Sequence, residues 1–162
     1  MTEQESPFTK ELMQTIFDAI RHCKVLGIKI HSIEGKQLTT RLAYSEQIIG
    51  NPVTGVIHGG ALTTLLDTTC GISLPIAMEE FTICPTLDLR IDYMSAAKPH
   101  QDIFGRAEVY RITKSVVFAK GIAFQEDETK PIAHCVATFM RLPQAVTDSV
   151  DAKDYLGNNY DG

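Results

Sequence analysis

The sequence lacks paired cysteines and metal-binding spacings. Its four cysteines are scattered, each in an apolar neighbourhood and without a C-x-x-C pair: Cys23, Cys70, Cys84 and Cys135. This usage is typical of small buried side chains in a reducing compartment, so we expect a cytoplasmic protein. The five histidines show no metal-ligand spacing, and no P-loop or dinucleotide-binding signature is present. We therefore predict neither a metal site nor a cofactor.

Long hydrophobic runs and an excess of positive charge are also missing. No apolar run approaches the roughly 18 residues that a bilayer span requires, and the polar N-terminus lacks the charged lead of a secretory signal. The net charge is −5, and much of it falls after Pro143, so the remaining chain is nearly neutral. A nearly neutral body argues against nucleic acid as the principal partner. We expect neither a nucleic acid nor a membrane as partner.

The length and composition are those of one ordinary globular domain. The chain has 162 residues, of which 44% are hydrophobic and 22% charged, enough to bury a core without disulfides. We assign residues 1–142 to this domain. The acidic segment 143–162 is either a mobile tail or a short helix that docks through apolar side chains. The candidates for that docking are Val146, Val150, Tyr155 and Leu156.

The N-terminal part predicts one helix followed by a hairpin. Ser6-Pro7 suits a helix start, apolar residues then recur at helical spacing, and Gly27 is a plausible end. Residues 28–33 and 37–43 predict a hairpin around Glu34-Gly35-Lys36. Residues 45–57, rich in Asn, Pro, Thr and Gly, predict a loop.

The second half predicts a nearly apolar helix and then four strands. The helix spans about 59–77, and because it lacks a charged face we expect it to be buried on most sides. Beyond it the hydrophobic period changes from 3.6 to 2, so Leu87–Tyr93 predicts a half-buried antiparallel strand. Further strands are expected at about 102–112, 115–126 and 131–141.

Small residues on the last two strands indicate how the helix packs. One face of these strands carries Val117, Ala119, Gly121, Ala123, Ala133, Cys135 and Ala137. Such a face lets a helix sit close against the sheet. We therefore predict an α+β domain in which an antiparallel sheet curves around the central helix, with an extra helix at the N-terminus.

The start of the central helix carries the residues best suited to chemistry. The glycines of His58-Gly59-Gly60 leave backbone N–H groups accessible to a polarised oxygen, as an oxyanion hole requires. Asp67 interrupts the apolar run that follows, and an unpaired carboxylate is costly to bury. It is either catalytic, or bonded to Thr63 or Thr64 or to a distant cation. His58 is a general acid/base or orients the loop through a backbone hydrogen bond.

These residues together resemble the hotdog-fold acyl-CoA thioesterases, in particular the phenylacetate-pathway (PaaI-like) branch. The signature of that branch is a glycine three residues before H-G-G and an aspartate seven residues after the second of those glycines. Here Gly55, His58-Gly59-Gly60 and Asp67 match it, and TLDLRIDYMSAAK at 86–98 is similar to the family's strand after the central helix. The resemblance covers about residues 10–142 and implies the hotdog fold.

The resemblance also implies an activity and an assembly. The chain would hydrolyse an acyl-CoA thioester as a homodimer or dimer of dimers, with sites at subunit interfaces. The Gly59 amide would polarise the thioester carbonyl, and Asp67 of the facing subunit would act as base or nucleophile. Thr86 falls where the family holds the attacking water, or is an ordinary strand residue. Asn51 lies seven residues before His58 rather than the usual six, and its alternative is an Asn-Pro turn.

Substrate contacts are predicted in two groups. The acyl pocket would be lined by Leu65, Leu66 and Thr69 on the helix, with loop 45–57 of a partner, and Gly60 is a further candidate for contact with the substrate. The phosphates of coenzyme A need cations, and the candidates are Arg90, Lys98, Arg111, Lys114 and Ser115. Two other activities remain open on the same fold: hydration of enoyl thioesters, and acyl-CoA binding without catalysis.

Overall fold

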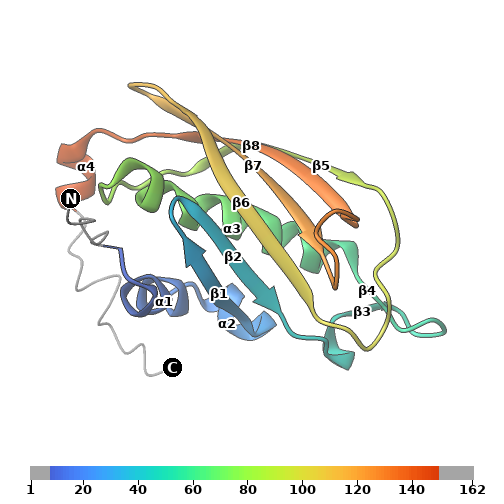
Figure 1. Ribbon diagram of the computed structural model, residues 1–162. Coiled ribbons are helices and arrows are strands. Elements are labelled where there is room, and N and C mark those ends of the chain that lie inside the picture. Colours follow the sequence, from blue (N-terminus) through green and yellow to red (C-terminus); the bar gives the residue numbers. More distant parts are fainter. Residues whose placement is uncertain (1–7, 150–162) are drawn as a thin grey trace.

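A six-stranded antiparallel sheet wraps around one long helix in the computed structural model, which describes residues 8–149 (Figure 1). The sheet order is β1-β2-β6-β7-β8-β5. Its strands are β1 (Ile28–Glu34), β2 (Gln37–Leu42), β5 (Thr86–Tyr93), β6 (Ile103–Ile112), β7 (Val116–Phe124) and β8 (Ala133–Met140). The helix is α3 (Gly59–Met78), which lies across the concave face. The predicted α+β architecture is confirmed.

The helix packs against small side chains, as the pattern on the last two strands predicts. Ala119, Ala123 and Ala133 are fully buried on the face toward α3. A side chain on Gly105 would lie 2.9 Å from the Thr69 hydroxyl, so the helix backbone approaches β6 closely. Of the described helices, α3 alone is long and apolar enough to match a bilayer span, but 67% of that stretch is buried inside the protein. It is the core helix of the domain.

Two short helices replace the single N-terminal helix predicted from the sequence. They are α1 (Lys10–Asp18) and α2 (Arg21–Leu26), and α1 begins after Thr9, whose side chain accepts from the Leu12 N–H. The predicted start at Ser6-Pro7 lies outside the described residues. The break agrees with the burial of two side chains, Phe17 and Cys23. In a continuous helix, six residues of separation would turn Cys23 by about 240° from Phe17, so the two side chains would point in different directions. Gly27 ends α2 in the left-handed conformation, as predicted.

The segment predicted as a loop contains its own small elements. A single turn, η1 (Glu46–Ile48), precedes a two-stranded hairpin of β3 (Ile49–Asn51) and β4 (Val56–Ile57). After β8, the helix α4 (Gln144–Ser149) docks through buried Thr147, whose hydroxyl accepts from the Ile83 N–H. Val146 is exposed, contrary to the predicted docking. Val150, Tyr155 and Leu156 lie outside the described residues.

The strand β5 forms one edge of the sheet and is only partly covered. Leu89 and Ile91 are half-buried, whereas Leu87 is 52% and Tyr93 54% exposed. The expectation of a regular half-buried strand is therefore wrong at both ends. Two physical reasons combine: β5 pairs with β8 alone, so its other edge has no neighbour among the described residues, and the register of β5 is interrupted at Leu87.

Candidate active site

Asp67 has one hydrogen-bond partner within residues 8–149, the hydroxyl of Thr86 at 3.0 Å. The alternative that Asp67 bonds Thr63 or Thr64 is wrong, because those hydroxyls donate to the carbonyls of Gly59 and Gly60. No described lysine or arginine forms an ion pair with Asp67. The carboxylate is half-buried. Among the described residues, the Asp67 carboxylate is thus hydrogen-bonded by the neutral Thr86 hydroxyl through one oxygen, and its second oxygen is available to a reactant.

A bulge in β5 aims Thr86 at Asp67. The register shifts between Thr86 and Asp88, so Leu87 is the extra residue. Thr86 pairs with buried Phe139 on β8, which places it on the face toward α3. Without the bulge, strict alternation would put Thr86 on the face opposite Leu89. The bulge therefore explains both the exposed Leu87 and the hydrogen bond to the carboxylate.

Two thiols near Asp67, those of Cys70 and Cys23, have raised pKa values. The hydrogen bond with Cys135 and burial raise the pKa of Cys70, and the charge of Asp67 raises it further. Burial raises the pKa of the Cys23 thiol, the Thr68 hydroxyl lowers it, and Asp67 again raises it. Because a thiol must ionise to attack a carbonyl, these cysteines are poor nucleophiles. Asp67 is the better candidate.

The first turn of α3 presents one free amide donor. The Gly60 N–H donates to Nδ1 of His58 at 2.9 Å, and the Ala61 N–H donates to the His58 carbonyl at 3.0 Å. For the Gly59 N–H, no acceptor is found within residues 8–149. A helix start leaves such amides to water, caps or ligands. The amide predicted to polarise the carbonyl is thus the one left open to a substrate.

His58 is the N-cap of α3, and this geometry separates its two possible roles. We expect His58→Ala to lower the free energy of unfolding by about 1 kcal/mol, the usual cost of a lost cap, and His58→Asn to restore most of it. If His58 only organises the helix start, His58→Asn also keeps most of the activity. Urea denaturation and thioester hydrolysis measured on both variants check this. Equal loss of activity in both variants, with stability restored in His58→Asn, would instead indicate acid/base chemistry.

Asn51 is occupied in the turn between β3 and β4. Its side-chain oxygen accepts from the N–H groups of Val53 and Thr54, at 2.9 and 3.2 Å. This is the geometry of the Asn-Pro turn alternative. The hairpin also carries an irregularity at Gly50, where the register shifts between Ile49 and Asn51. The structure does not bring Asn51 into hydrogen-bond contact with Asp67 or Thr86.

Gly55 holds the same hairpin against the body of the domain. It has a positive φ of 73°, and its carbonyl accepts from the Tyr44 hydroxyl at 2.9 Å. Tyr44 is fixed in turn by its N–H bond to Asp102 and by ring contact with His100. Burial would raise the pKa of Asp102, but the Tyr44 N–H and the Arg41 guanidinium hold it below its ordinary value. The motif glycine is thus a structural residue of the loop.

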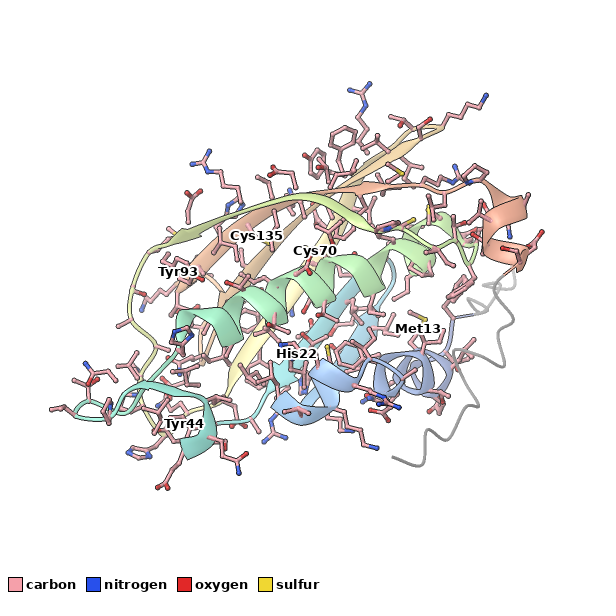
Figure 2. The ribbon with its side chains drawn as sticks, turned by 180° about the vertical axis from the view of Figure 1, so that it is seen from behind. Met13, His22, Tyr44, Cys70, Tyr93 and Cys135 are labelled. Carbon is pink, nitrogen blue, oxygen red and sulfur yellow. The ribbon has the colours of Figure 1, made fainter. Side chains whose placement is uncertain are left out.

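Tyr93 contacts the start of α3 and was missed by the sequence reasoning. Its hydroxyl donates to the Gly59 carbonyl at 2.9 Å and lies 2.9 Å from the Thr63 hydroxyl. Figure 2 shows Tyr93 beside the first turn of the helix, at the opposite end of β5 from Thr86. Strand alternation places Tyr93 on the face toward α3. The alternation does not indicate which residue of the helix Tyr93 contacts, and in the structure that residue is Gly59.

The candidate cations for coenzyme A do not gather in one place. Arg90 pairs with Asp92 at 3.0 Å and Lys98 with Glu126 at 3.1 Å. Arg111 and Lys114 lie exposed at the turn between β6 and β7, beside Ser115. Leu66 is fully buried in the core. Within one chain, then, Leu66 belongs to the core, Arg90 and Lys98 are paired with carboxylates, and Arg111 and Lys114 share the turn between β6 and β7.

A hollow of about 380 Å³ lies on the outer face of the sheet, away from Asp67 and Gly59. Its charges are already paired: Lys120 with Glu108, and Arg106 with Glu128. We do not place the reaction there. The described residues contain no group of three or more His, Cys, Asp or Glu side chains that could hold a metal ion.

The two reactive groups of one chain are too far apart to serve one carbonyl. Gly59 and Asp67 lie on the same helix, and eight residues at 1.5 Å each separate them by about 12 Å along its axis. A carbonyl bound at the Gly59 amide would have its oxygen about 3 Å from that donor. Asp67 of the same chain would then lie beyond attacking distance. If Gly59 and Asp67 serve one carbonyl, the two groups must come from different helices.

Comparison with known proteins agrees with this fold. The family model of the thioesterase superfamily matches residues 54–132. A Pseudomonas aeruginosa protein of known crystal structure is 55% identical, over 82% of this chain and 98% of that one, with a TM-score of 0.75. The chain belongs to the thioesterase superfamily. Its sheet and central helix are those of the hotdog fold.

Two more distant relatives carry functional names. The PaaI protein from the phenylacetic acid degradation operon of E. coli is 18% identical, over 79% of this chain and 88% of that one, with a TM-score of 0.69. A Halobacterium salinarum protein whose esterase assignment is itself a prediction is 26% identical over 123 residues, 74% of this chain and 80% of its own. The first shows the fold alone. Together with the family, the second favours hydrolysis of an acyl compound.

Proposed function

We propose that this protein hydrolyses acyl-CoA thioesters to a carboxylic acid and free coenzyme A. The observation that carries the proposal is the pairing of an open amide donor, the Gly59 N–H, with a carboxylate, Asp67, that no described cation neutralises. An amide at a helix start stabilises the negative charge that develops on a carbonyl oxygen during acyl transfer. A half-buried carboxylate can activate water or attack the carbonyl itself.

The reaction follows from these two groups. The Gly59 N–H donates to the thioester oxygen while an oxygen nucleophile attacks the carbonyl carbon, and collapse of the adduct breaks the C–S bond. As a base, Asp67 takes a proton from the attacking water, and the leaving thiolate is then protonated. As a nucleophile, Asp67 forms an anhydride that water cleaves. Thr86, whose hydroxyl donates to Asp67 at 3.0 Å, would orient the carboxylate or the water.

We also propose a homodimer in which each site combines Gly59 of one chain with Asp67 of the other. The distance along α3 requires two helices, and a two-fold axis supplies both sites at once. The edge strand β5 supports this assembly, because a long unpaired edge is a template for pairing with another chain. Leu87, Tyr93 and Met94 expose 52%, 54% and 62% of their surface along it.

A second apolar surface supports the association of two dimers. On the sheet face opposite α3, Tyr110 is 53% exposed and its ring lies near Phe118, while Val136 and Met140 are also exposed. Back-to-back packing of two such faces would form a tetramer. We also propose a cytoplasmic location, because the four cysteines are free and thiols stay reduced in that compartment.

Mixing two inactive variants tests the composite site. Asp67→Asn and Gly59→Pro chains are each expected to be nearly inactive, but a mixed dimer contains one intact Gly59 facing one intact Asp67. Random exchange of subunits gives half mixed dimers with one working site of two, so about a quarter of wild-type activity should return. Unfolding and refolding the variants together, with each refolded alone as control, checks this. No recovery would mean that each site lies within one chain.

A substrate panel tests the reaction itself. We expect thiol release from acyl-CoA thioesters, measured with a thiol reagent over aliphatic chain lengths and aryl substrates, phenylacetyl-CoA included. Loss of the double-bond absorbance of crotonyl-CoA without thiol release would indicate a hydratase. Tight binding of acyl-CoA without turnover would indicate a binding protein. Either result would contradict the proposed function.

A further inference from the structure

We propose that Tyr93 is a positioning residue that fixes the oxyanion donor at Gly59. Its hydroxyl lies 2.9 Å from the Gly59 carbonyl oxygen and 2.9 Å from the Thr63 hydroxyl oxygen. The ring packs over the glycine, since a Cβ added there would lie 3.3 Å from the tyrosine oxygen and 3.5 Å from the adjoining ring carbon. The inference depends on the proposed hydrolysis, for which Gly59 supplies the donor.

The peptide group between Gly59 and Gly60 is held at both ends. Its carbonyl accepts from Tyr93, and its N–H donates to Nδ1 of His58 at 2.9 Å. The preceding peptide, which carries the free Gly59 N–H, joins this group through a Cα that has no side chain. Glycine leaves that junction unusually free to rotate. Clamping the following peptide therefore limits how far the donor amide can turn away from a bound carbonyl.

Tyr93 is better suited to this role than to stabilising the fold. The Gly59 carbonyl also accepts from the Thr63 hydroxyl at 3.1 Å, so it keeps a partner when the tyrosine hydroxyl is removed. In the single chain Tyr93 is 54% exposed, so this hydrogen bond adds little to the stability of the chain, and a phenylalanine there would keep the ring at the edge of β5. The hydrogen bonds of Tyr93 connect distant parts of the chain, because they join the edge strand β5 to a helix turn 30 or more residues earlier.

The two hydroxyl protons limit which hydrogen bonds the Thr63 hydroxyl, the Tyr93 hydroxyl and the Gly59 carbonyl can form at the same time. Thr63 and Tyr93 carry one hydroxyl proton each, and three contacts join these hydroxyls and the Gly59 carbonyl. If both hydroxyls donate to the carbonyl, no proton remains for the contact between them. If Thr63 donates to Tyr93 instead, the tyrosine hydroxyl is the one side-chain donor among these two that remains on the carbonyl, beside the helix's own backbone bond. In both of these arrangements Tyr93 donates to the Gly59 carbonyl. In a third, Tyr93 donates to the Thr63 hydroxyl, which itself donates to that carbonyl, so β5 stays hydrogen-bonded to the first turn of α3 in all three.

The test is Tyr93→Phe, which removes the hydroxyl and keeps the ring. Misplacing a donor that acts mainly in the transition state lowers kcat rather than raising KM. We expect kcat to fall about tenfold and KM to stay within twofold, with an unchanged melting temperature. Complete loss of the donor, at about 10²–10³-fold, sets the upper limit. The matched control is Tyr110→Phe, because Tyr110 is 53% exposed and lies on the outer face, away from α3.

A second measurement does not depend on turnover. Hydrogen exchange of peptides covering residues 58–63 should be faster in Tyr93→Phe than in wild type, and unchanged in Tyr110→Phe. Wild-type kcat in Tyr93→Phe, an equal fall in the control, or unaltered exchange would overturn the inference. If wild type releases thiol from no acyl-CoA, the proposed function fails, while the exchange experiment still decides whether Tyr93 restrains the first turn.

Discussion

Replacing Asp67 with asparagine should lower kcat for acyl-CoA hydrolysis by about 10²–10⁴-fold, the usual range for a lost general base, and further if Asp67 is the nucleophile. The amide keeps the size of the side chain and an oxygen that can accept from Thr86, so the local hydrogen bond survives. The negative charge and the basicity disappear. Thiol release under saturating substrate measures the effect.

The matched control for Asp67 is Asp148→Asn. Asp148 is also a helical carboxylate that accepts one hydrogen bond from a neutral side chain, that of Gln144 at 2.8 Å, but it lies on α4, away from Thr86 and α3. We expect wild-type turnover in this variant. Wild-type turnover in Asp67→Asn would remove Asp67 from the mechanism. Label found in Asp67 after a single turnover in ¹⁸O-labelled water would establish the nucleophilic route, because only attack of water on the Asp67 carbonyl of an anhydride places it there.

Replacing Gly59 with proline is expected to lower kcat by about 10²–10³-fold, the cost of losing one oxyanion donor. Gly59 is the first residue of α3, a position at which proline is well tolerated. The preceding residue, His58, has φ −65° and ψ 136°, the extended conformation that proline requires before it. The substitution therefore removes the N–H while the helix can still begin at the same residue.

Gly59→Ala separates the donor from the added side chain. Alanine keeps the N–H but places a Cβ at 3.3 Å from the Tyr93 oxygen, the contact that the proline variant also makes. We expect Gly59→Ala to retain most of the activity that Gly59→Pro loses. Kinetics of both variants, with circular dichroism to verify the fold, compare them. Equal losses would show that crowding against Tyr93, rather than the missing donor, lowers the rate.

The architecture could be predicted because each local pattern agrees with the packing it produces. The uncharged run at 59–77 predicts a buried helix, and α3 spans Gly59–Met78. Small residues at alternate positions of β7 and β8 predict a close helix, and Ala119 and Ala137 are buried there. Residues near one another in the chain, such as His58 and Gly60, also have their geometry largely determined by the helix start.

The features that could not be predicted depend on how distant elements pair and pack. The bulge at Leu87 shifts Thr86 to the inner face, yet the residue types of the strand give no sign of it. The break between α1 and α2 is required by the burial of Cys23, which a periodic helix pattern does not reveal. Tyr93 meets Gly59 only because β5 runs alongside α3, so its contact could be seen only once both elements were placed.

The sheet order has a consequence for how this chain is made. Among residues 8–149, β5 has β8 as its one neighbour, although β6 and β7 are synthesised between them. Residues 94–140 must leave the ribosome before β5 can pair along its length, which takes several seconds at about 5–20 residues per second. Early in that interval, before β6 and β7 emerge, the apolar α3 lacks most of its sheet. Folding is therefore completed late, and a nascent chain stalled before β8 exposes a β5 unpaired on both sides.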